Sequence, residues 1–269
     1  MTAPNYFELM LKTNDELLRL SSWFNSNKLS LNIKKTNYML FAKSTVKPNH
    51  DFELLIDNTP IVRVHETKLL GLVIDDNLNW KSHIDYVSSK IARNIGIIYR
   101  LRSFVNKSTS KTLYYSLIFS QLSYCIIIWG YAVQSALNSL VKLQKKVVRI
   151  LSGAQYLAHT NPLFILNNIL KVRDIYSKEL LIFMYKAKAK LLPSVCMQYF
   201  AAPKVSVYNL RVNLDFVQIF ARTSIKLHSV AYTGPRIWNT LPLDLRHSCS
   251  LFVFKKRITD HFIGLYKIE

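Results

Sequence analysis

A long uncharged window restricts the fold more than any other part of the sequence. No Asp, Glu, Lys or Arg occurs between Lys111 and Lys142, and residues 113–133 are apolar and long enough to cross a bilayer as one helix. Ser116, Ser120 and Ser123 recur at helical spacing, which would place a polar stripe on one helix face. The stripe favours a helix buried among other helices. A membrane span stays open as the alternative, because hydropathy alone does not separate the two.

The first 75 residues combine helical and strand-like patterns. Apolar residues from Leu17 to Phe24 gather on one side of a predicted amphipathic helix over residues 14–26. Strands are expected at residues 36–42, 52–56, 61–64 and 68–74, with a turn-rich loop at residues 57–60. This part is therefore predicted to be a small mixed α/β region.

From Trp80 onward the apolar spacing becomes helical. Near the C-terminus, Gly234-Pro235 and Leu241-Pro242 are expected to end elements on either side of an anchoring Trp238. A loop is expected around Pro203 and a helix after Leu214. The strongest predicted helices cover residues 81–104, 108–129, 134–151 and 172–192, and a final helix is expected at 250–266. The predicted fold class is α+β, with a mostly α-helical part following the mixed region.

The balance of charge favours a polyanionic partner. Formal net charge is +20, and residues 141–269 hold 20 basic against 6 acidic residues. An excess of this size favours nucleic acid first and an anionic membrane surface second. The C-terminal half is the part expected to face the polyanion.

Four cations at helical spacing form a candidate nucleic-acid contact. Lys142, Lys145, Lys146 and Arg149, called the basic ridge below, fall on one face of the predicted helix 134–151. Leu140, Val147 and Leu151 fall on the opposite face. The ridge suits a phosphate backbone, and a merely solvated surface is the other interpretation. Lys90, Arg93 and Arg100 form a looser second stripe.

Several kinds of site are absent from the sequence. Cys125, Cys196 and Cys249 are widely spaced, so neither a disulfide framework nor a metal site is expected, and a reducing intracellular compartment fits. With only 6 glycines there is no phosphate loop, dinucleotide fingerprint or nucleophile elbow. No basic-then-apolar leader precedes residue 10.

Five strings stand in a recognisable order along the chain. The first runs from Trp23 to Asn32 and continues through Lys35-Thr36 to Phe41, and the second runs from Lys68 to Trp80. The others are Tyr124 with Trp129-Gly130, the segment Leu143–Ile150, and the Gly234–Pro242 corner with Phe254-Lys255-Lys256. Together they resemble motif D, motif E (the primer grip), the thumb and the C-terminal region of LINE-type, jockey-like non-LTR retrotransposon reverse transcriptases. The resemblance covers residues 14 to 266.

The resemblance implies a domain division and roles for particular residues. It implies a palm remnant at residues 1–79, a helical thumb-like region at 80–192 and a basic C-terminal region at 193–269. Lys35 would lie in motif D, near the departing pyrophosphate. Lys68, Leu69, Leu70 and Gly71 would form the primer grip. A cation suits both places, since each faces phosphate charge.

The family's catalytic carboxylates are not found in this sequence. Such polymerases hold two Mg²⁺ ions with an Asp on one strand and an aromatic-x-Asp-Asp hairpin, both of which precede motif D. Asp75-Asp76 follows Leu72-Val73-Ile74 instead, and is expected to form a strand end and turn leading to Asn79 as a helix N-cap. We therefore expect no catalytic or metal-binding residue in this chain, with Mg²⁺ bound only where an upstream palm is present.

The resemblance thus implies a reverse transcriptase fragment of a mobile element that retains template–primer-binding parts. An RNA template and a DNA primer are the expected partners, in the nucleus or cytoplasm, and the fragment alone is expected to be inactive. The alternative is a domesticated basic helical protein that binds a partner helix or a membrane and no longer binds nucleic acid.

Overall fold

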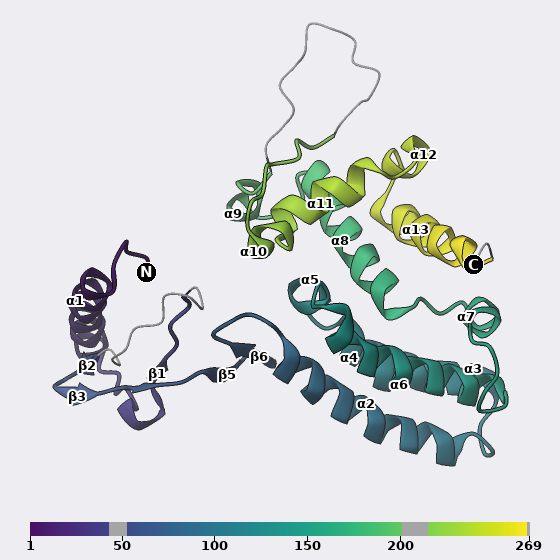
Figure 1. The fold of residues 1–269 in the computed structure, drawn as a ribbon, viewed down its shortest axis with the longest axis horizontal. Coiled ribbons are helices and arrows are strands. Elements are labelled where there is room, and N and C mark those ends of the chain that lie inside the picture. Colours follow the sequence, from purple (N-terminus) through teal and green to yellow (C-terminus); the bar gives the residue numbers. More distant parts are fainter. Residues whose placement is uncertain (43–52, 201–214, 268–269) are drawn as a thin grey trace, which may run out of the picture. The chain divides into compact units, whose positions relative to one another are not determined.

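The computed structural model describes residues 1–42, 53–200 and 215–267, and these divide into two compact units (Figure 1). The first unit is Met1–His83 and the second is Ile84–Glu269. Among the described residues, the first unit carries the short strands, and the regular structure of the second unit is helical. The α+β prediction is therefore confirmed.

Helix α1 (Tyr6–Ser26) starts eight residues earlier than predicted because Asn5 caps it. The Asn5 side chain accepts a hydrogen bond from the backbone N–H of Glu8 at 2.8 Å, which satisfies a donor that a helix start leaves unpaired. Asn14 ties the helix to the strand region, because its amide donates to Glu53 O at 3.1 Å and accepts from Leu55 N–H at 3.0 Å.

In its described residues, the first unit has a small core and three two-stranded ladders. Leu54, Ile56 and Ile61 are buried and pack against apolar side chains of α1, among them Leu17. The parallel ladder joins β1 (Asn37–Tyr38) to β4 (Val62–Arg63). The antiparallel ladders join β2 (Leu55–Ile56) to β3 (Thr59–Pro60) and β5 (Glu66–Leu69) to β6 (Leu72–Asp75).

The strands between residues 36 and 75 differ from the prediction, chiefly at two hairpin turns. The predicted strand 68–74 is two strands, because Leu70 and Gly71 both have positive φ (48° and 89°) and reverse the chain. The predicted loop 57–60 is shorter, since only Asp57 and Asn58 form the turn, with φ of 48° and 60°. The predicted strand 36–42 is reduced to the two residues of β1. Predicted strand residue Phe52 lies outside the described residues.

Most predicted helices of the second unit are present with shifted ends. The predicted helix 81–104 is α2 (Lys81–Leu101), and 134–151 is α6 (Gln134–Ser152). The predicted helix 172–192 is α8 (Val172–Lys188), and 250–266 is α13 (Leu251–Leu265). Shorter helices are α7 (Asn161–Asn167), α9 (Ser194–Met197), α10 (Ser224–Leu227), α11 (Val230–Asn239) and α12 (Leu243–Arg246).

The uncharged window is not one helix. The predicted helix 108–129 is divided into α3 (Lys107–Tyr114), whose end enters the window, a π-helical turn η2 (Tyr115–Phe119), α4 (Ser120–Ser123) and α5 (Ile126–Trp129). The chain breaks at Cys125, whose φ is 49°, and Trp129 Nε1 donates back to Tyr124 O at 2.9 Å. Ile118, Leu122 and Trp129 are fully buried, as the core interpretation requires. In the part of the chain that the structure describes, no helix has both the length and the apolar character needed to cross a membrane.

The C-terminal core forms where α8 lies beside α11 and α13 (Figure 1). Trp238 is fully buried there and packs between Phe216 and Phe254, with ring centroids at 6.0 and 5.6 Å. The prediction that Gly234-Pro235 ends an element is wrong, because both residues lie inside α11. A Cβ at Gly234 would come within 2.5 Å of Met184 Sδ, so glycine lets α11 approach α8 closely. The predicted helix after Leu214 begins only at Ser224, and the loop predicted around Pro203 lies outside the described residues.

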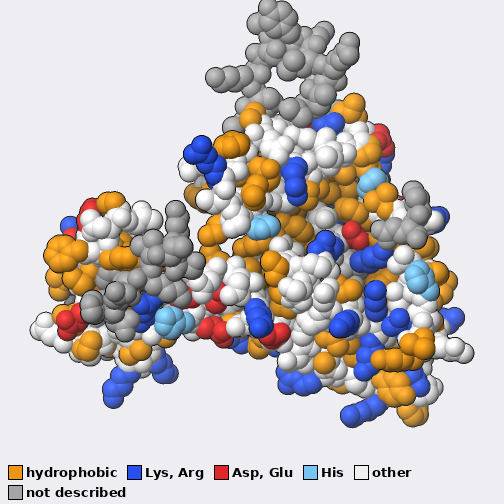
Figure 2. All heavy atoms as spheres, in the orientation of Figure 1, with side chains coloured by type: hydrophobic (Ala, Val, Ile, Leu, Met, Phe, Trp, Pro, Cys, Tyr) orange, Lys and Arg blue, Asp and Glu red, His pale blue; other side chains and the backbone are white. Residues whose placement is uncertain are grey.

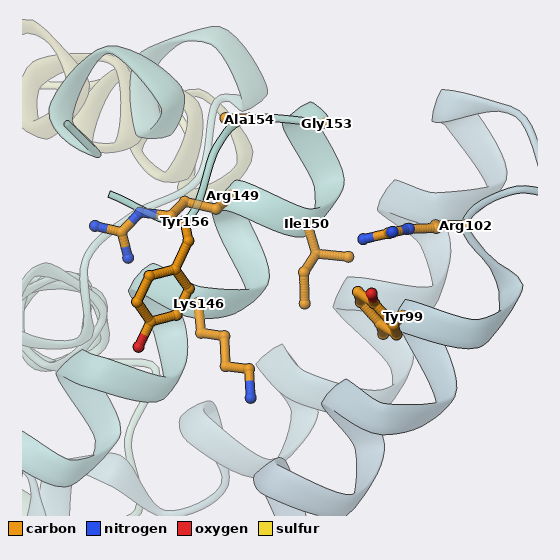
Figure 3. A pocket seen from close by; sticks show the side chains of 8 residues that line it. All are labelled: Tyr99, Arg102, Lys146, Arg149, Ile150, Gly153, Ala154 and Tyr156. Atoms are coloured by element: carbon orange, nitrogen blue, oxygen red, sulfur yellow. The ribbon is translucent and has the colours of Figure 1, made fainter. Parts of the chain in front are cut away.

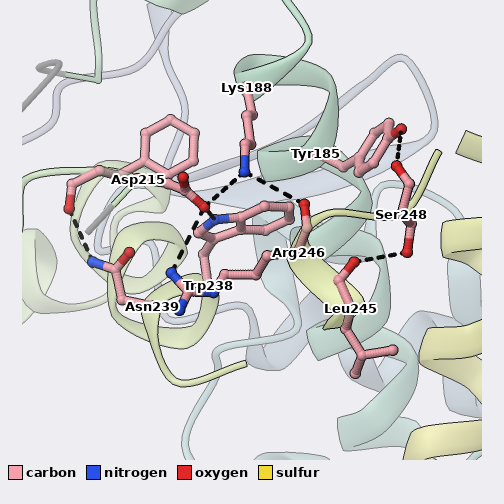
Figure 4. Close-up of polar contacts among 9 residues, drawn as sticks. Tyr185, Lys188, Asp215, Trp238, Asn239, Leu245, Arg246 and Ser248 are labelled. Carbon is pink, nitrogen blue, oxygen red and sulfur yellow. Dashed lines mark hydrogen bonds and ion pairs between the residues drawn. The ribbon is translucent and has the colours of Figure 1, made fainter. Parts of the chain in front are cut away.

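One carboxylate fastens this core (Figure 4). Asp215 Oδ2 accepts from Trp238 Nε1 at 2.8 Å and from Lys188 Nζ at 3.0 Å, and Arg246 Nη1 lies 3.7 Å away. Burial disfavours the ionised form of Asp215, but these hydrogen bonds and positive charges outweigh it and lower the pKa of the carboxyl. Asp215 is therefore a charged link between α8, α11 and α12.

Candidate nucleic-acid interface

Helix α6 carries the basic ridge on a firmly packed support. Leu140, Val147 and Leu151 are buried, as the pattern predicts. The helix ends at Gly153, which has a φ of 63°, and the next N–H, of Ala154, donates to Arg149 O at 3.0 Å. These contacts fix both the rotation of α6 and the start of the following loop.

A buried amide sets the position of α6 against its neighbours. Gln144 Nε2 donates to Tyr114 Oη at 3.1 Å and to Leu170 O at 2.8 Å. Gln144 Oε1 accepts from Val172 N–H at 3.0 Å. Burial of Tyr114 raises the pKa of its hydroxyl, which stays neutral in this contact. Gln144 thereby links α6 to α3 and to the start of α8.

The ridge residues differ in their surroundings. Lys142, Lys145 and Lys146 are exposed, whereas Arg149 is half-buried and donates from Nε to Ala158 O at 2.9 Å. Three of the four cations thus extend toward solvent from one face of α6, and the fourth also holds the loop after it. Figure 2 shows Lys and Arg side chains spread over the visible face of the second unit, with few acidic side chains among them.

A pocket opens beside the C-terminal end of α6 (Figure 3). It has a volume of about 580 Å³ and is lined by cations and tyrosines around Ile150, Gly153 and Ala154. In the view, Tyr99 and Arg102 lie on one side of Ile150, and Lys146, Arg149 and Tyr156 lie on the other. The sequence pattern identified Lys146 and Arg149 but missed Tyr99, Arg102 and Tyr156. Nothing in the sequence places Tyr99, Arg102 or Tyr156 beside α6, because they come from the end of α2 and from the loop after α6.

The second basic stripe lies along α2. The Lys90 ammonium sits 4.5 Å from the centre of the Tyr86 ring, and Arg93 and Arg100 are exposed. None of these three residues lines the pocket beside α6.

The predicted motif D and primer-grip residues belong to the first unit. Lys35 is exposed at the end of the short 3-10 helix η1 (Ile33–Lys35). Lys68 and Leu69 end strand β5, and Leu70 with Gly71 forms the turn into β6. Leu70 is 84% exposed. An apolar side chain is thus presented at a hairpin tip, next to an exposed lysine.

The carboxylates of Asp75 and Asp76 both contact neighbouring groups. Asp75 accepts hydrogen bonds from the backbone N–H groups of Asn77, Asn79 and Trp80 at 3.0–3.2 Å. Asp76 contacts His65 Nδ1 and the Asn77 amide, both at 2.7 Å. Asn79 accepts from Lys81 N–H at 2.9 Å, but Trp80 separates it from α2, so the predicted N-cap residue Asn79 lies one residue before the N-cap position. Within the described ranges, no three His, Cys, Asp or Glu side chains gather as a metal ion would need.

Comparison with known proteins finds similarity to mobile-element polymerases. The chain is 24% identical over 152 residues to "Probable RNA-directed DNA polymerase from transposon X-element" of Drosophila melanogaster, covering 55% of this chain and 16% of that protein. It is 28% identical over 108 residues to "RNA-directed DNA polymerase from mobile element jockey" of Drosophila funebris, covering 39% of this chain and 12% of that protein. The chain therefore spans less than a fifth of either relative. No protein-family model and no solved structure matches it. The similarity agrees with a LINE-type reverse transcriptase fragment.

Proposed function

We propose that this chain is a segment of an RNA-directed DNA polymerase from a LINE-type mobile element, and that its helical unit holds template–primer duplex. The basic ridge on α6 is the observation that carries the proposal. Lys142, Lys145 and Lys146 are exposed on one helix face, and the opposite face is buried. Residues 141–269 hold 20 basic and 6 acidic residues, so the surroundings add to the attraction for phosphate.

Salt dependence of duplex binding tests this function. Replacing Lys142, Lys145 and Lys146 by Gln leaves Arg149 in place, so the loop that Arg149 holds through Ala158 is not disturbed. Each lost duplex contact should reduce the slope of log affinity against log salt by about 0.9, so the triple variant should be shallower by roughly three units. Fluorescence anisotropy with an RNA–DNA hybrid duplex at several salt concentrations measures this slope.

A matched control separates the ridge from bulk charge. Lys226, Lys255 and Lys256 are exposed lysines of the same unit that belong to α10 and α13, and their replacement removes the same net charge. The control variant should keep most of the wild-type slope. Equal slopes in the two triple variants would show that the ridge is only a solvated surface. Wild-type binding that does not change with salt would count against a phosphate-binding function altogether.

The proposal assigns the chemistry of polymerisation to carboxylates outside this chain. Asp75 accepts a hydrogen bond from Trp80 N–H and Asp76 contacts His65 Nδ1, so we expect no primer extension by the chain alone with Mg²⁺ and deoxynucleotides. Lys35 is proposed to lie near the departing pyrophosphate, and Lys68, Leu69, Leu70 and Gly71 to contact the primer. In a chain extended with a catalytic palm, Lys35→Ala and Lys68→Ala should each slow nucleotide addition. Extension by the unextended chain would mean that the active site has been misplaced.

A further inference from the structure

The pocket beside α6 differs in chemistry from the basic ridge. The ridge offers cations alone, whereas the pocket joins Arg102 and Lys146 to two exposed tyrosines, Tyr99 and Tyr156. Its volume of about 580 Å³ lies in the range of small-ligand pockets and is too small for a duplex. Cations beside accessible aromatic rings are the combination that binds unpaired nucleotides, through phosphate and base together.

One side of the pocket is already arranged as a stacked pair. The Arg102 guanidinium lies 3.9 Å from the centre of the Tyr99 ring, and Tyr99 remains 51% exposed. This contact holds a planar cation at the edge of the pocket (Figure 3). A guanidinium held in this way can donate to a phosphate or stack on a base, and it loses less side-chain conformational entropy than an unrestrained arginine would.

The other side is an aromatic ring on a restrained loop. Tyr156 is 80% exposed, yet its loop is tied at both ends. Ala154 N–H donates to Arg149 O at 3.0 Å before it, and Arg149 Nε donates to Ala158 O at 2.9 Å after it. A large exposed ring on a restrained loop, with Lys146 beside it, suits contact with a flat ligand more than it suits core packing.

We propose that this pocket binds one unpaired nucleotide of a single strand, with its base against Tyr156 and its phosphate at Lys146 and Arg102. The inference rests on the proposed nucleic-acid function and deepens it, because it adds a single-strand site next to the duplex-binding ridge. In a duplex the bases stack on each other and their faces are covered, so only an unpaired base can use the ring. Lys142 and Lys145 do not line the pocket and belong to the ridge alone.

Substitutions at Tyr156 test the site with three probes: a short oligouridine, the same strand with abasic positions, and an RNA–DNA hybrid duplex. Tyr156→Ala should weaken oligouridine binding by about 5- to 150-fold, the range measured for loss of one base–aromatic stack. Tyr156→Phe should bind like the wild type, because the ring is kept. Binding of the abasic strand and of the duplex should change less than twofold in both variants.

A second tyrosine and the salt slope serve as controls. Tyr199 is also exposed and belongs to the same unit but does not line the pocket, so Tyr199→Ala should bind oligouridine like the wild type. The salt slope of Tyr156→Ala should equal that of the wild type, since no charge is lost. Duplex binding with no loss of oligouridine affinity in Tyr156→Ala would overturn the pocket assignment while leaving the duplex function intact. A wild type that binds none of the three probes would overturn both.

Discussion

Replacing Asp215 by Asn should loosen the C-terminal core of the second unit without changing its shape. The Asp215 carboxylate accepts from Trp238 Nε1 at 2.8 Å and from Lys188 Nζ at 3.0 Å, and Arg246 lies 3.7 Å away. An amide is nearly the same size as a carboxylate, so packing around Trp238 should be retained. The charge is lost, however, and the cations of Lys188 and Arg246 are left without it.

The expected loss of stability follows from these contacts. Hydrogen bonds to a charged group contribute about 1.5–3 kcal/mol and neutral ones about 0.5–1.5 kcal/mol, so two weakened bonds cost about 2 kcal/mol. Arg246 is buried, and losing the negative charge 3.7 Å from its guanidinium adds to this loss. The Asp215 side chain is 22% exposed, so solvent screening limits the added term. Together these effects give about 2–4 kcal/mol at neutral pH.

Urea unfolding followed by far-UV circular dichroism measures the loss through the shift in midpoint at constant slope. Asp244→Asn is the matched control, because Asp244 also binds an arginine, Arg257, at 2.6 Å but is 67% exposed. An exposed pair of this kind contributes about 0–1 kcal/mol. Equal midpoints for Asp215→Asn and Asp244→Asn would refute the reasoning.

The stability difference between the wild type and Asp215→Asn should also depend on pH. The pKa of Asp215 is lowered in the folded protein, so its ionised form stabilises the fold above the unfolded pKa of about 3.9. That contribution is lost as the pH falls through the lower, folded-state pKa. The difference in unfolding free energy between wild type and Asp215→Asn should therefore be full at neutral pH and shrink as the pH falls below about 4. A difference that grew on acidification would have the wrong sign.

Two further substitutions test the packing of the helical unit. Gly130→Ala should lower the free energy of unfolding by about 1–3 kcal/mol, because the new Cβ would lie 2.6 Å from both Ile126 O and Tyr176 Cδ2. Gly96→Ala is the control and should stabilise α2 slightly, because a Cβ there would have nothing within 4 Å. Equal thermal midpoints for the two variants would contradict this packing argument. Gln144→Leu should cost about 3 kcal/mol or more, because Tyr114 Oη, Leu170 O and Val172 N–H lose a buried partner. Urea midpoints compare Gln144→Leu with Gln134→Leu, a control at the exposed first residue of α6. Similar midpoints for the two variants would show that Gln144 does not link α6 to α3 and α8.

The sequence predicts the long helices of the second unit well because their apolar spacing is regular. The predicted helix 134–151 differs from α6 by one residue at its C-terminal end, and α13 is similarly close. The helix break inside the uncharged window is harder to predict. It lies at Cys125, which adopts a left-handed conformation, and no glycine or proline marks the position in the sequence. The turn between β5 and β6 is hard to predict for the same reason, because Leu70 also has a positive φ and only Gly71 is a typical turn residue.

Tertiary contacts account for the remaining errors. Gly234-Pro235 is a strong local breaker, yet the close approach of α11 to Met184 keeps the helix continuous through it. The pocket beside α6 takes residues from the end of α2, from α6 and from the loop after α6. Periodicity within one segment detects Lys146 and Arg149 and carries no information about Tyr99 or Tyr156.

The contacts of Gln144 have a consequence for how this helical unit tolerates insertions and deletions. One side chain on α6 meets a hydroxyl from α3, a carbonyl before α8 and the first N–H of α8. Adding or removing one residue within α3, α6 or α8 rotates part of that helix by about 100°. Such a change would leave the buried partners of Gln144 facing the wrong side chain. Length variation should therefore be confined to the segments between these helices, while the spacing within each helix stays fixed.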